Sequence, residues 1–358
     1  MPTYTCDICQ TIFQRKSNYD SHKARKRPCK KNEVVTTLQT ALQTAGVPVP
    51  TKSLAETTMA KPILKWVGGK TQILQQVLEL FPKEMTNYHE PFLGGGSVLL
   101  GLLTCVKEGL IKVTGTIYAS DLNGNLIGLY KNIQSQPDAL IAQIRALVDE
   151  FSKIKGTAVN RKPATHEEAL TSPESYYYWI RGRFNELSAA ERGSVTGSAM
   201  LLFMNKTCFR GVYREGPHGF NVPFGHYKNP GILDEEHLRA VSALIQAVVF
   251  TVSGFGESLT RCTAGDFAYL DPPYAPVDEK SFVSYTADGF DLAAHTELFK
   301  ACVGLAARNV KMLMSNADVN LVKNAFPTPT YTTKIISCRR AINSTDPSER
   351  ANEVLITS

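Results

Sequence analysis

The stretch His89-Glu-Pro-Phe-Leu-Gly-Gly-Gly-Ser97 joins the end of an apolar strand to a glycine loop and the start of a helix. Glycines in such a loop let backbone N–H groups approach a bound ligand closely. The stretch fails as a dinucleotide-binding fingerprint, because Leu99 occupies the position of the third glycine. The next predicted strand leads to Asp121, where a carboxylate is well placed to hold ribose hydroxyls. The alternative is that Asp121 is the N-cap of the following helix.

Around this stretch, from Lys61 onward, short apolar runs alternate with helical stretches, which predicts an α/β sheet. A polar, aromatic-rich insertion at 155–235 interrupts the alternation. The predicted strands are 87–91, 115–119, 248–253, 267–270 and 311–315, and the predicted helices are 71–80, 97–108, 123–134, 138–154 and 295–307.

The most specific motif is Asp271-Pro272-Pro273-Tyr274, which directly follows the apolar strand 267–270. It therefore lies at the carboxyl edge of the sheet, where α/β proteins bind ligands. The Asp271 carboxylate and the Pro272 carbonyl can both accept hydrogens of an amino group, and the double proline holds them rigidly. Tyr274 offers a ring on which a base taken out of a duplex can stack. The alternative is a structural turn that ends the strand.

Other features exclude whole classes of protein. Gly68-Gly-Lys-Thr71 is not a phosphate-binding loop, because Leu64 stands where that motif needs glycine. No run of about 18 apolar residues is present, and residues 1–10 lack the apolar segment of a signal peptide. The eight cysteines are irregularly spaced, which is typical of a reducing compartment. We therefore expect a protein without membrane association that stays inside the cell.

The first 31 residues predict a separate ββα zinc finger. Cys6, Cys9, His22 and Cys29 are the candidate ligands, and so short a unit needs the metal in order to fold. The spacing from His22 to Cys29 is wider than usual, and the alternative is two unrelated cysteines in a basic tail. Residues 32–60 are interpreted as a linker with a short helix near 34–44.

Charge is concentrated in this finger. The chain carries a net charge of +6, and residues 1–31 alone contain eight Lys or Arg against two Asp. Attraction for a polyanion such as DNA is therefore expected mainly there. The finger positions that read bases would be Arg15, Asn18 and Ser21. The competing hypothesis is that the finger binds a protein partner.

Several motifs together resemble the Dam-type DNA adenine methyltransferases, over roughly residues 61–357. They occur in the order found in that family and are specific in combination. They are Lys65-Trp66-Val-Gly68-Gly-Lys70, Glu90–Gly96, Asp121, Phe220-Asn-Val-Pro-Phe-Gly225, Asp271–Tyr274, and the terminal Arg339-Arg-Ala-Ile-Asn343 and Glu353-Val-Leu-Ile-Thr357. The resemblance implies a Rossmann-like S-adenosylmethionine-dependent core over 61–358, with 155–235 as an inserted target-recognition subdomain.

The resemblance also implies roles for single residues. S-adenosylmethionine would be bound by Trp66, Lys70, Glu90, Gly94, Gly96, Asp121 and Asp271, and Asp271–Tyr274 would act on the N6 amino group of a flipped adenine. Double-stranded DNA, with a GATC-like site as the first expectation, would be contacted by Lys65, Arg210, Arg214 and Pro223. The family often has Asn where Arg210 stands, so the target sequence is not transferred directly.

Two other functions remain open at this point. Cytosine N4 methylation uses a similar geometry, but Asp rather than Ser at position 271 favours adenine. A catalytically inactive zinc-finger protein on a methyltransferase fold would be expected to have a degraded tetrapeptide, and this one is intact. Because the finger lies outside the bacterial family pattern, a eukaryotic nucleus or a viral replication site in a eukaryotic cell is expected, with the cytoplasm as the alternative. The sequence does not indicate pairing with a restriction endonuclease or an oligomeric state.

Overall fold

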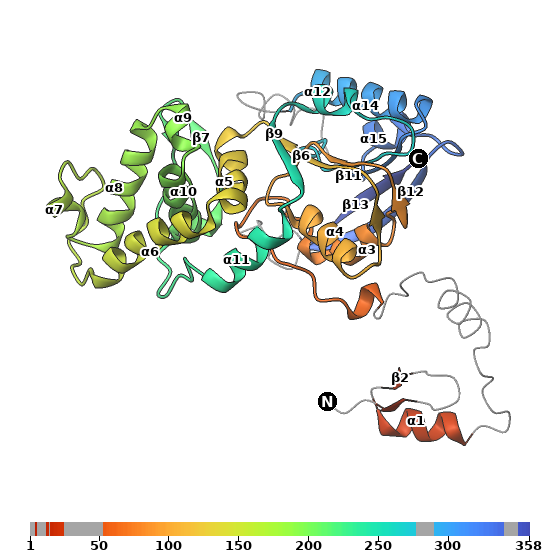
Figure 1. Cartoon of the computed structure of the whole chain (residues 1–358), viewed down its shortest axis with the longest axis horizontal. Helices are drawn as coiled ribbons and strands as arrows, with labels where there is room; N and C mark the ends of the chain where they lie inside the picture. The colour runs from red at the N-terminus through yellow and green to blue at the C-terminus, as the bar shows by residue number, and fades with distance from the viewer. Residues whose placement is uncertain (1–3, 6–11, 14, 25–52, 277–289, 340–349) are drawn as a thin grey trace. The chain divides into compact units, whose positions relative to one another are not determined.

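The computed structural model describes residues 4–5, 12–13, 15–24, 53–276, 290–339 and 350–358. The chain divides into two compact units, residues 1–51 and 52–358 (Figure 1). Residues 53–60, at the end of the predicted linker, belong to the second unit. Met59 packs against its core, and the Ala60 N–H donates to Thr104 Oγ1 at 3.3 Å.

The first unit contains two short antiparallel strands, β1 (Tyr4–Thr5) and β2 (Ile12–Phe13), followed by helix α1 (Lys16–Lys23). The Phe13 and His22 rings lie 4.8 Å apart, and His22 is buried although the unit is small. Three of the four predicted zinc ligands, Cys6, Cys9 and Cys29, and the predicted helix at 34–44 lie outside the described residues.

A mixed seven-stranded sheet is the centre of the second unit, in the order β12-β13-β11-β10-β4-β6-β9. The neighbours from β11 to β9 pair in parallel, whereas β13 is antiparallel to both β11 and β12. The α/β prediction is confirmed, and each predicted strand overlaps an observed one. The strands are β4 Tyr88–Glu90, β6 Ile117–Asp121, β9 Val248–Val252, β10 Phe267–Leu270, β11 Lys311–Ala317, β12 Thr332–Arg339 and β13 Arg350–Thr357.

Helices cover both faces of this sheet (Figure 1). In β10, Ala268 and Leu270 belong to one buried cluster and Phe267 and Tyr269 to the other, because successive side chains point to opposite faces. Both faces of the strand are thus apolar, as is typical of parallel sheets. The covering helices are α3 Leu74–Leu78, α4 Ser97–Lys107 and α5 Gly124–Ser135, and on the other face α12 Phe255–Thr260, α14 Leu292–Ala307 and α15 Asn320–Ala325.

The insertion between α5 and β9 is mainly helical rather than irregular. The aromatic residues that obscured its pattern are buried: Tyr176, Tyr177 and Phe184 of α8 have no exposed surface. Helix α10 packs against α5, α6 and α8, so α6 is part of this subdomain as well. The elements are α6 Pro137–Lys153, α7 His166–Ala169, α8 Pro173–Glu186, α9 Ala189–Arg192, α10 Val195–Thr207, β7 Glu215–Gly216, β8 Gly219–Phe220 and α11 Glu235–Leu244.

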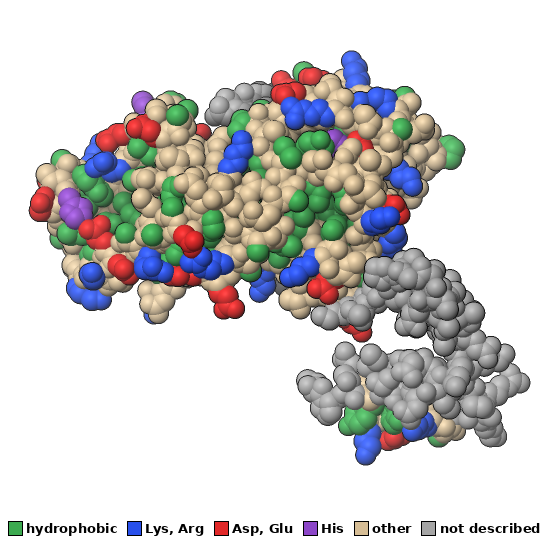
Figure 2. Space-filling view, in the orientation of Figure 1, with side chains coloured by type: hydrophobic (Ala, Val, Ile, Leu, Met, Phe, Trp, Pro, Cys, Tyr) green, Lys and Arg blue, Asp and Glu red, His purple; other side chains and the backbone are tan. Residues whose placement is uncertain are grey.

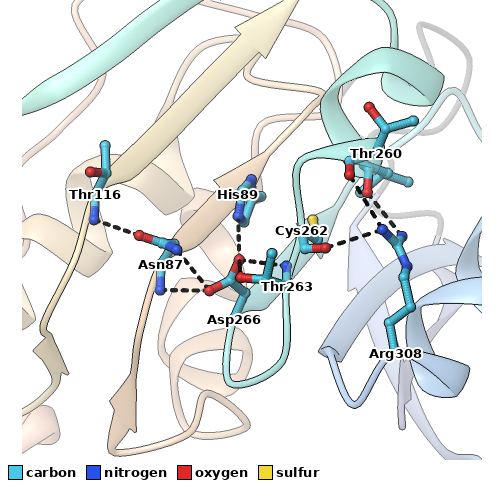
Figure 3. Close-up of polar contacts among 9 residues, drawn as sticks. Asn87, His89, Thr116, Thr260, Cys262, Thr263, Asp266 and Arg308 are labelled. Carbon is cyan, nitrogen blue, oxygen red and sulfur yellow. Dashed lines mark hydrogen bonds and ion pairs between the residues drawn. The ribbon is translucent and has the colours of Figure 1, made fainter.

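A buried polar network fixes the amino edge of the sheet (Figure 3). The Asp266 carboxylate accepts hydrogen bonds from the Asn87 N–H and side-chain amide, at 3.0 and 2.8 Å, and from the Thr263 N–H at 2.9 Å. It also lies 3.0 Å from His89 Nε2. Asn87 Oδ1 accepts the Thr116 N–H at 2.8 Å, so the network joins the beginnings of β4, β6 and β10.

We expect Asp266→Ala to lower the free energy of unfolding by about 3–5 kcal/mol, since it leaves several buried donors without a partner. The hydrogen bonds from Thr263, His89 and Asn87 outweigh the effect of burial and hold the pKa of Asp266 below its ordinary value. The stabilisation is therefore present above about pH 4 and is lost as the pH falls further. Denaturant unfolding at neutral pH measures the effect, with the exposed Asp149→Ala as control. Equal unfolding midpoints for the two variants would contradict it.

Candidate active site

The strand order reverses at β4. Strands β6 and β9 lie on one side of it, and β10 and β11 on the other. In such sheets ligands bind outside the carboxyl ends of the strands at the point of reversal. The glycine loop follows β4, Asp121 ends β6, and Asp271 follows β10. Three predicted motifs from distant parts of the sequence therefore meet at one edge of the sheet.

The glycine loop is held tightly between two aromatic side chains. The Tyr130 hydroxyl donates to the Gly95 carbonyl at 2.7 Å, and a Cβ added to Gly96 would lie 2.4 Å from that hydroxyl oxygen. On the other side, a Cβ added to Gly95 would lie 2.8 Å from the Cβ of Trp66. Gly94 and Gly96 also have φ values of 48° and 68°, a region that side chains disfavour. The loop requires glycine at these positions.

Asp121 connects the glycine loop to the start of α5. One carboxylate oxygen accepts the Gly94 N–H at 3.0 Å, and the other accepts the Asn123 N–H at 2.9 Å. Burial raises the pKa of Asp121 above its ordinary value, and these backbone bonds oppose the rise. The N-cap of α5 is Asn123, whose side chain accepts the Leu126 N–H at 3.1 Å. The alternative interpretation of Asp121 as the helix cap is therefore wrong.

Asp271 forms an ion pair with Lys70, at 2.7 Å between Oδ2 and Nζ. The Lys70 side chain is 5% exposed and that of Asp271 is 18% exposed. Lys70 Nζ also donates to the Gly68 carbonyl at 2.7 Å and lies 4.9 Å from the centre of the Tyr274 ring. Burial raises the pKa of Asp271, and Lys70 counteracts that rise. Pro272 is buried, whereas Pro273 is exposed.

Glu90 is the last residue of β4, before the glycine loop. It is 3% exposed and accepts the Tyr88 hydroxyl at 2.6 Å. Burial raises the pKa of Glu90 to about 8, and the Leu99 N–H in the first turn of α4 is among the groups that oppose the rise. A contact between Glu90 and a cofactor stays a prediction.

Asn205 joins the segment before the glycine loop to the segment that contains the predicted DNA-contacting residues Arg210 and Arg214. Its side chain exchanges two hydrogen bonds of 2.9 Å with the backbone of Lys65 and donates to the Gly211 carbonyl at 3.0 Å. Next to it, the Trp66 and Tyr213 rings stack with centres 5.3 Å apart. Neither Asn205 nor Tyr213 was given a role of its own from the sequence, although both lie in the segment 205–214 that resembles the family's DNA-reading hairpin. The local signal for Asn205 is its place directly after the apolar run of α10.

The predicted DNA-contacting arginines lie around the short β7–β8 hairpin. Arg214 is exposed and donates through Nε to Asn221 Oδ1 at 2.6 Å. Arg210 is exposed at a turn, with φ of 57°, and its guanidinium lies over the Phe209 ring. The Pro223 carbonyl accepts the Phe209 N–H at 2.8 Å, which closes this loop on itself.

In the first unit, Asn18 and Ser21 are exposed on α1, and Arg15 is exposed at its N-cap. Asn18 and Ser21 are three residues apart and therefore share one side of the helix, which Arg15 precedes. Within the described ranges no group of three or more His, Cys, Asp or Glu side chains is arranged to hold a metal ion. Three predicted zinc ligands lie outside those ranges, so this finding does not test the finger.

A glycine loop, a strand-terminal carboxylate and an Asp-Pro-Pro-Tyr turn at one edge of the sheet suit an α/β methyltransferase that acts on an amino group. Residues 66–342 match the D12 class N6 adenine-specific DNA methyltransferase family, and the chain belongs to that family. The chain is therefore a DNA adenine N6-methyltransferase, and S-adenosylmethionine is the methyl donor expected for it. The family favours adenine over the cytosine alternative.

Individual relatives of the chain support the same family assignment. The chain is 38% identical over 264 residues to the type II methyltransferase M.MjaIII of Methanocaldococcus jannaschii, covering 72% of this chain and 84% of that protein. It is 28% identical over 287 residues to the DNA adenine methylase of Escherichia coli K12, covering 79% and 90%. It is also 28% identical to the Retron Ec67 DNA adenine methylase of Escherichia coli, over 83% of this chain and 90% of that one.

These relatives are bacterial and archaeal, and they give no support to the predicted nuclear or viral setting. In the described part of the chain, no helix is both long enough and apolar enough to span a bilayer.

Proposed function

We propose that the enzyme methylates adenine within a GATC-like site, with S-adenosylmethionine bound beside the glycine loop, Trp66 and Asp121. The observation that carries this proposal is the hydrogen bond of 3.0 Å between the Gly94 N–H and Asp121. It brings the loop after β4 to the end of β6, at the same edge of the sheet as Asp271. The cofactor and the catalytic tetrapeptide would then meet at the point where the strand order reverses.

The donor and acceptor groups at this edge suit a nucleoside cofactor. Each Asp121 oxygen accepts one backbone N–H and retains capacity for a ribose hydroxyl. The glycine loop presents backbone where any side chain would collide with Trp66 or Tyr130. Glu90 would support the loop from below through Tyr88 and the first turn of α4. When bound, S-adenosylmethionine supplies a methyl group on a positively charged sulfur.

On the substrate side, the Asp271 carboxylate and the Pro272 carbonyl would accept the two hydrogens of the adenine amino group. That arrangement favours a nitrogen whose lone pair points at the methyl donor. The Lys70 ion pair opposes the effect of burial, so it favours the ionised form of Asp271 as an acceptor. Tyr274 would stack on the flipped base. Transfer is direct, without a covalent enzyme intermediate.

Sequence reading is assigned to the loop and hairpin at 205–226, which contain Pro223, with Lys65 beside them. Arg210 stands at an exposed turn with its guanidinium over the Phe209 ring, and Asn221 accepts a hydrogen bond from the Arg214 guanidinium. Arginine is the side chain best suited to a bidentate contact with guanine. We therefore assign base contact to Arg210 and Arg214, and support of the hairpin to Arg214 as well.

Sequencing of modified bases in DNA from cells that express the protein should show N6-methyladenine in a GATC-like site. Arg210→Ala should relax the preference at one base pair, because a bidentate contact contributes about 1–3 kcal/mol of discrimination. Arg239→Ala, at an exposed arginine on α11, serves as the control. Uniform loss of affinity over all sequences would show that Arg210 contacts phosphate. An unmethylated genome would contradict the proposed function itself.

We also propose that residues 1–31 form a zinc finger, with Cys6, Cys9, His22 and Cys29 as ligands, which tethers the enzyme to DNA. Support comes from the β1–β2–α1 order, the buried His22 beside Phe13 and the charge distribution. Figure 2 shows acidic and basic side chains interspersed on the visible face of the second unit. The net charge of +6 belongs to the first 31 residues, because the remaining sequence contains equal numbers of acidic and basic side chains.

Deleting residues 1–51 should leave the turnover number and the methylation site unchanged. It should raise the apparent dissociation constant for DNA and flatten its salt dependence, because fewer phosphates are neutralised. A variant with Cys6→Ser and Cys9→Ser retains the basic charge and separates zinc-dependent folding from charge alone. Titrations of DNA at several salt concentrations measure both effects. Identical affinity and salt slope in the truncated enzyme would support a protein partner for the finger instead.

A further inference from the structure

A carboxylate from the far end of the chain reaches the catalytic tetrapeptide. The Tyr274 hydroxyl donates a hydrogen bond to Glu353 Oε2 at 2.8 Å. Glu353 lies on β13 opposite Ala317, the last residue of β11, and therefore at the same carboxyl edge of the sheet as Asp271. Glu353 itself is half-buried.

The contact extends into the ion pair of the site. Lys70 Nζ lies 4.9 Å from the centre of the Tyr274 ring and 2.7 Å from Asp271. Glu353 thus stands at one end of a row of contacting side chains, and the carboxylate that would accept the adenine hydrogens stands at the other. In the proposed mechanism, neither Glu353 nor the Tyr274 hydroxyl takes part in methyl transfer itself.

A second contact from the same pair of strands holds the loop on its other side. Asn316, fully buried at the end of β11, accepts the Ala275 N–H through Oδ1 at 3.0 Å. The backbone after Tyr274 is therefore fixed to β11. The direction of the Tyr274 ring remains adjustable. Among the described residues, the only hydrogen bond of the Tyr274 side chain is the one to Glu353.

We propose that Glu353 is a positioning residue, which holds the plane of the Tyr274 ring in the orientation that stacks on the target adenine. The inference rests on the proposed stacking role of Tyr274. The hydroxyl remains a donor throughout the working pH range, because burial and the nearby Asp271 and Glu353 charges raise the pKa of Tyr274 well above its ordinary value. A ring fixed before the base arrives avoids the rate loss that small misplacements of a reacting group cause.

The test compares Glu353→Ala, Glu353→Gln, Tyr274→Phe and the double variant Tyr274→Phe/Glu353→Ala in the full chain. We expect Glu353→Ala to lower kcat about ten- to a hundredfold, the range for a misplaced reacting geometry. Its affinity for S-adenosylmethionine, measured by calorimetry, should be unchanged. Glu353→Gln should restore most of the activity, since its amide oxygen still accepts the hydroxyl. Tyr274→Phe should equal Glu353→Ala, and the double variant should be no worse than either.

A duplex with 2-aminopurine at the target position reports stacking of the flipped base independently of turnover. Its fluorescence in the complex should change in Glu353→Ala and not in Glu84→Ala, an exposed glutamate on the short strand β3 (Glu84–Met85). Unchanged kcat in Glu353→Ala would overturn the proposal. So would losses that multiply in the double variant, or a Gln variant as poor as the Ala variant.

Failure of the proposed stacking role of Tyr274 would give a different set of results. If Tyr274→Ala, which removes the ring entirely, leaves kcat unchanged, then Tyr274 does not stack on the base and the proposed site fails at that point. If Tyr274→Ala is impaired but Glu353→Ala is not, only the positioning role of Glu353 fails. Unfolding midpoints measured for every variant separate both results from loss of stability.

Discussion

Replacing Asp271 with alanine is expected to reduce the methylation rate by at least a hundredfold while leaving DNA binding largely intact. The carboxylate is the acceptor proposed to hold the adenine amino group, and loss of one preorganised polar contact of this kind costs about 10²–10³ in kcat. The change also leaves Lys70, 5% exposed, without its ion-pair partner. Some loss of stability is therefore expected in addition.

Single-turnover methylation of a duplex, together with DNA titration, measures the two effects separately. Asp271→Asn is the matched variant, because it retains the size of the side chain and one acceptor oxygen while removing the charge. We expect Asp271→Asn to fold with less loss of stability than Asp271→Ala and to remain strongly impaired. Retention of more than a few per cent of activity by Asp271→Ala would remove Asp271 from the mechanism.

Replacing Asp121 with alanine is expected to weaken binding of S-adenosylmethionine about ten- to a hundredfold, with less effect on turnover at saturating cofactor. A hydrogen bond to a charged group contributes about 1.5–3 kcal/mol, which corresponds to that range of affinity. The structure adds a second cause, because Asp121 also anchors the Gly94 N–H of the glycine loop. Calorimetric titration with the cofactor gives the affinity directly.

Asn123→Ala is the control for this experiment. It removes the N-cap of α5 next to Asp121 and leaves the carboxylate in place. If cofactor affinity falls in Asp121→Ala but not in Asn123→Ala, the loss of affinity is due to the Asp121 carboxylate. Equal losses in both variants would show that only the local backbone matters, and the assigned contact with the cofactor would be wrong.

Local patterns were sufficient to predict the parallel part of the sheet. Apolar runs such as 267–270 are buried on both faces, so their apolar composition alone identifies them as strands. Strands β12 and β13 were not predicted, because Thr, Lys, Ser, Arg and Asn interrupt their apolar runs. The helices of the insertion were missed for a related reason: buried tyrosines in α8 make a helical face look like a polar, aromatic-rich loop.

For the site, the sequence indicated which motifs matter but not how they contact one another. The bond between Tyr274 and Glu353 joins residues 79 positions apart, and that between Lys65 and Asn205 spans 140. No spacing rule predicts such contacts, because they depend on the order of strands in the sheet. The role of Asn123 as the N-cap in place of Asp121 also required backbone geometry, since both residue types are good caps.

The stacking of Trp66 against Tyr213 has a practical consequence. The chain contains two tryptophans, and the other, Trp179, lies on α8 in the helical insertion. In a Trp179→Phe background, all indole fluorescence would originate from the point where the glycine loop meets the hairpin. The enzyme thus carries an intrinsic optical probe, with which stopped-flow mixing could time the arrival of cofactor and DNA without any attached dye.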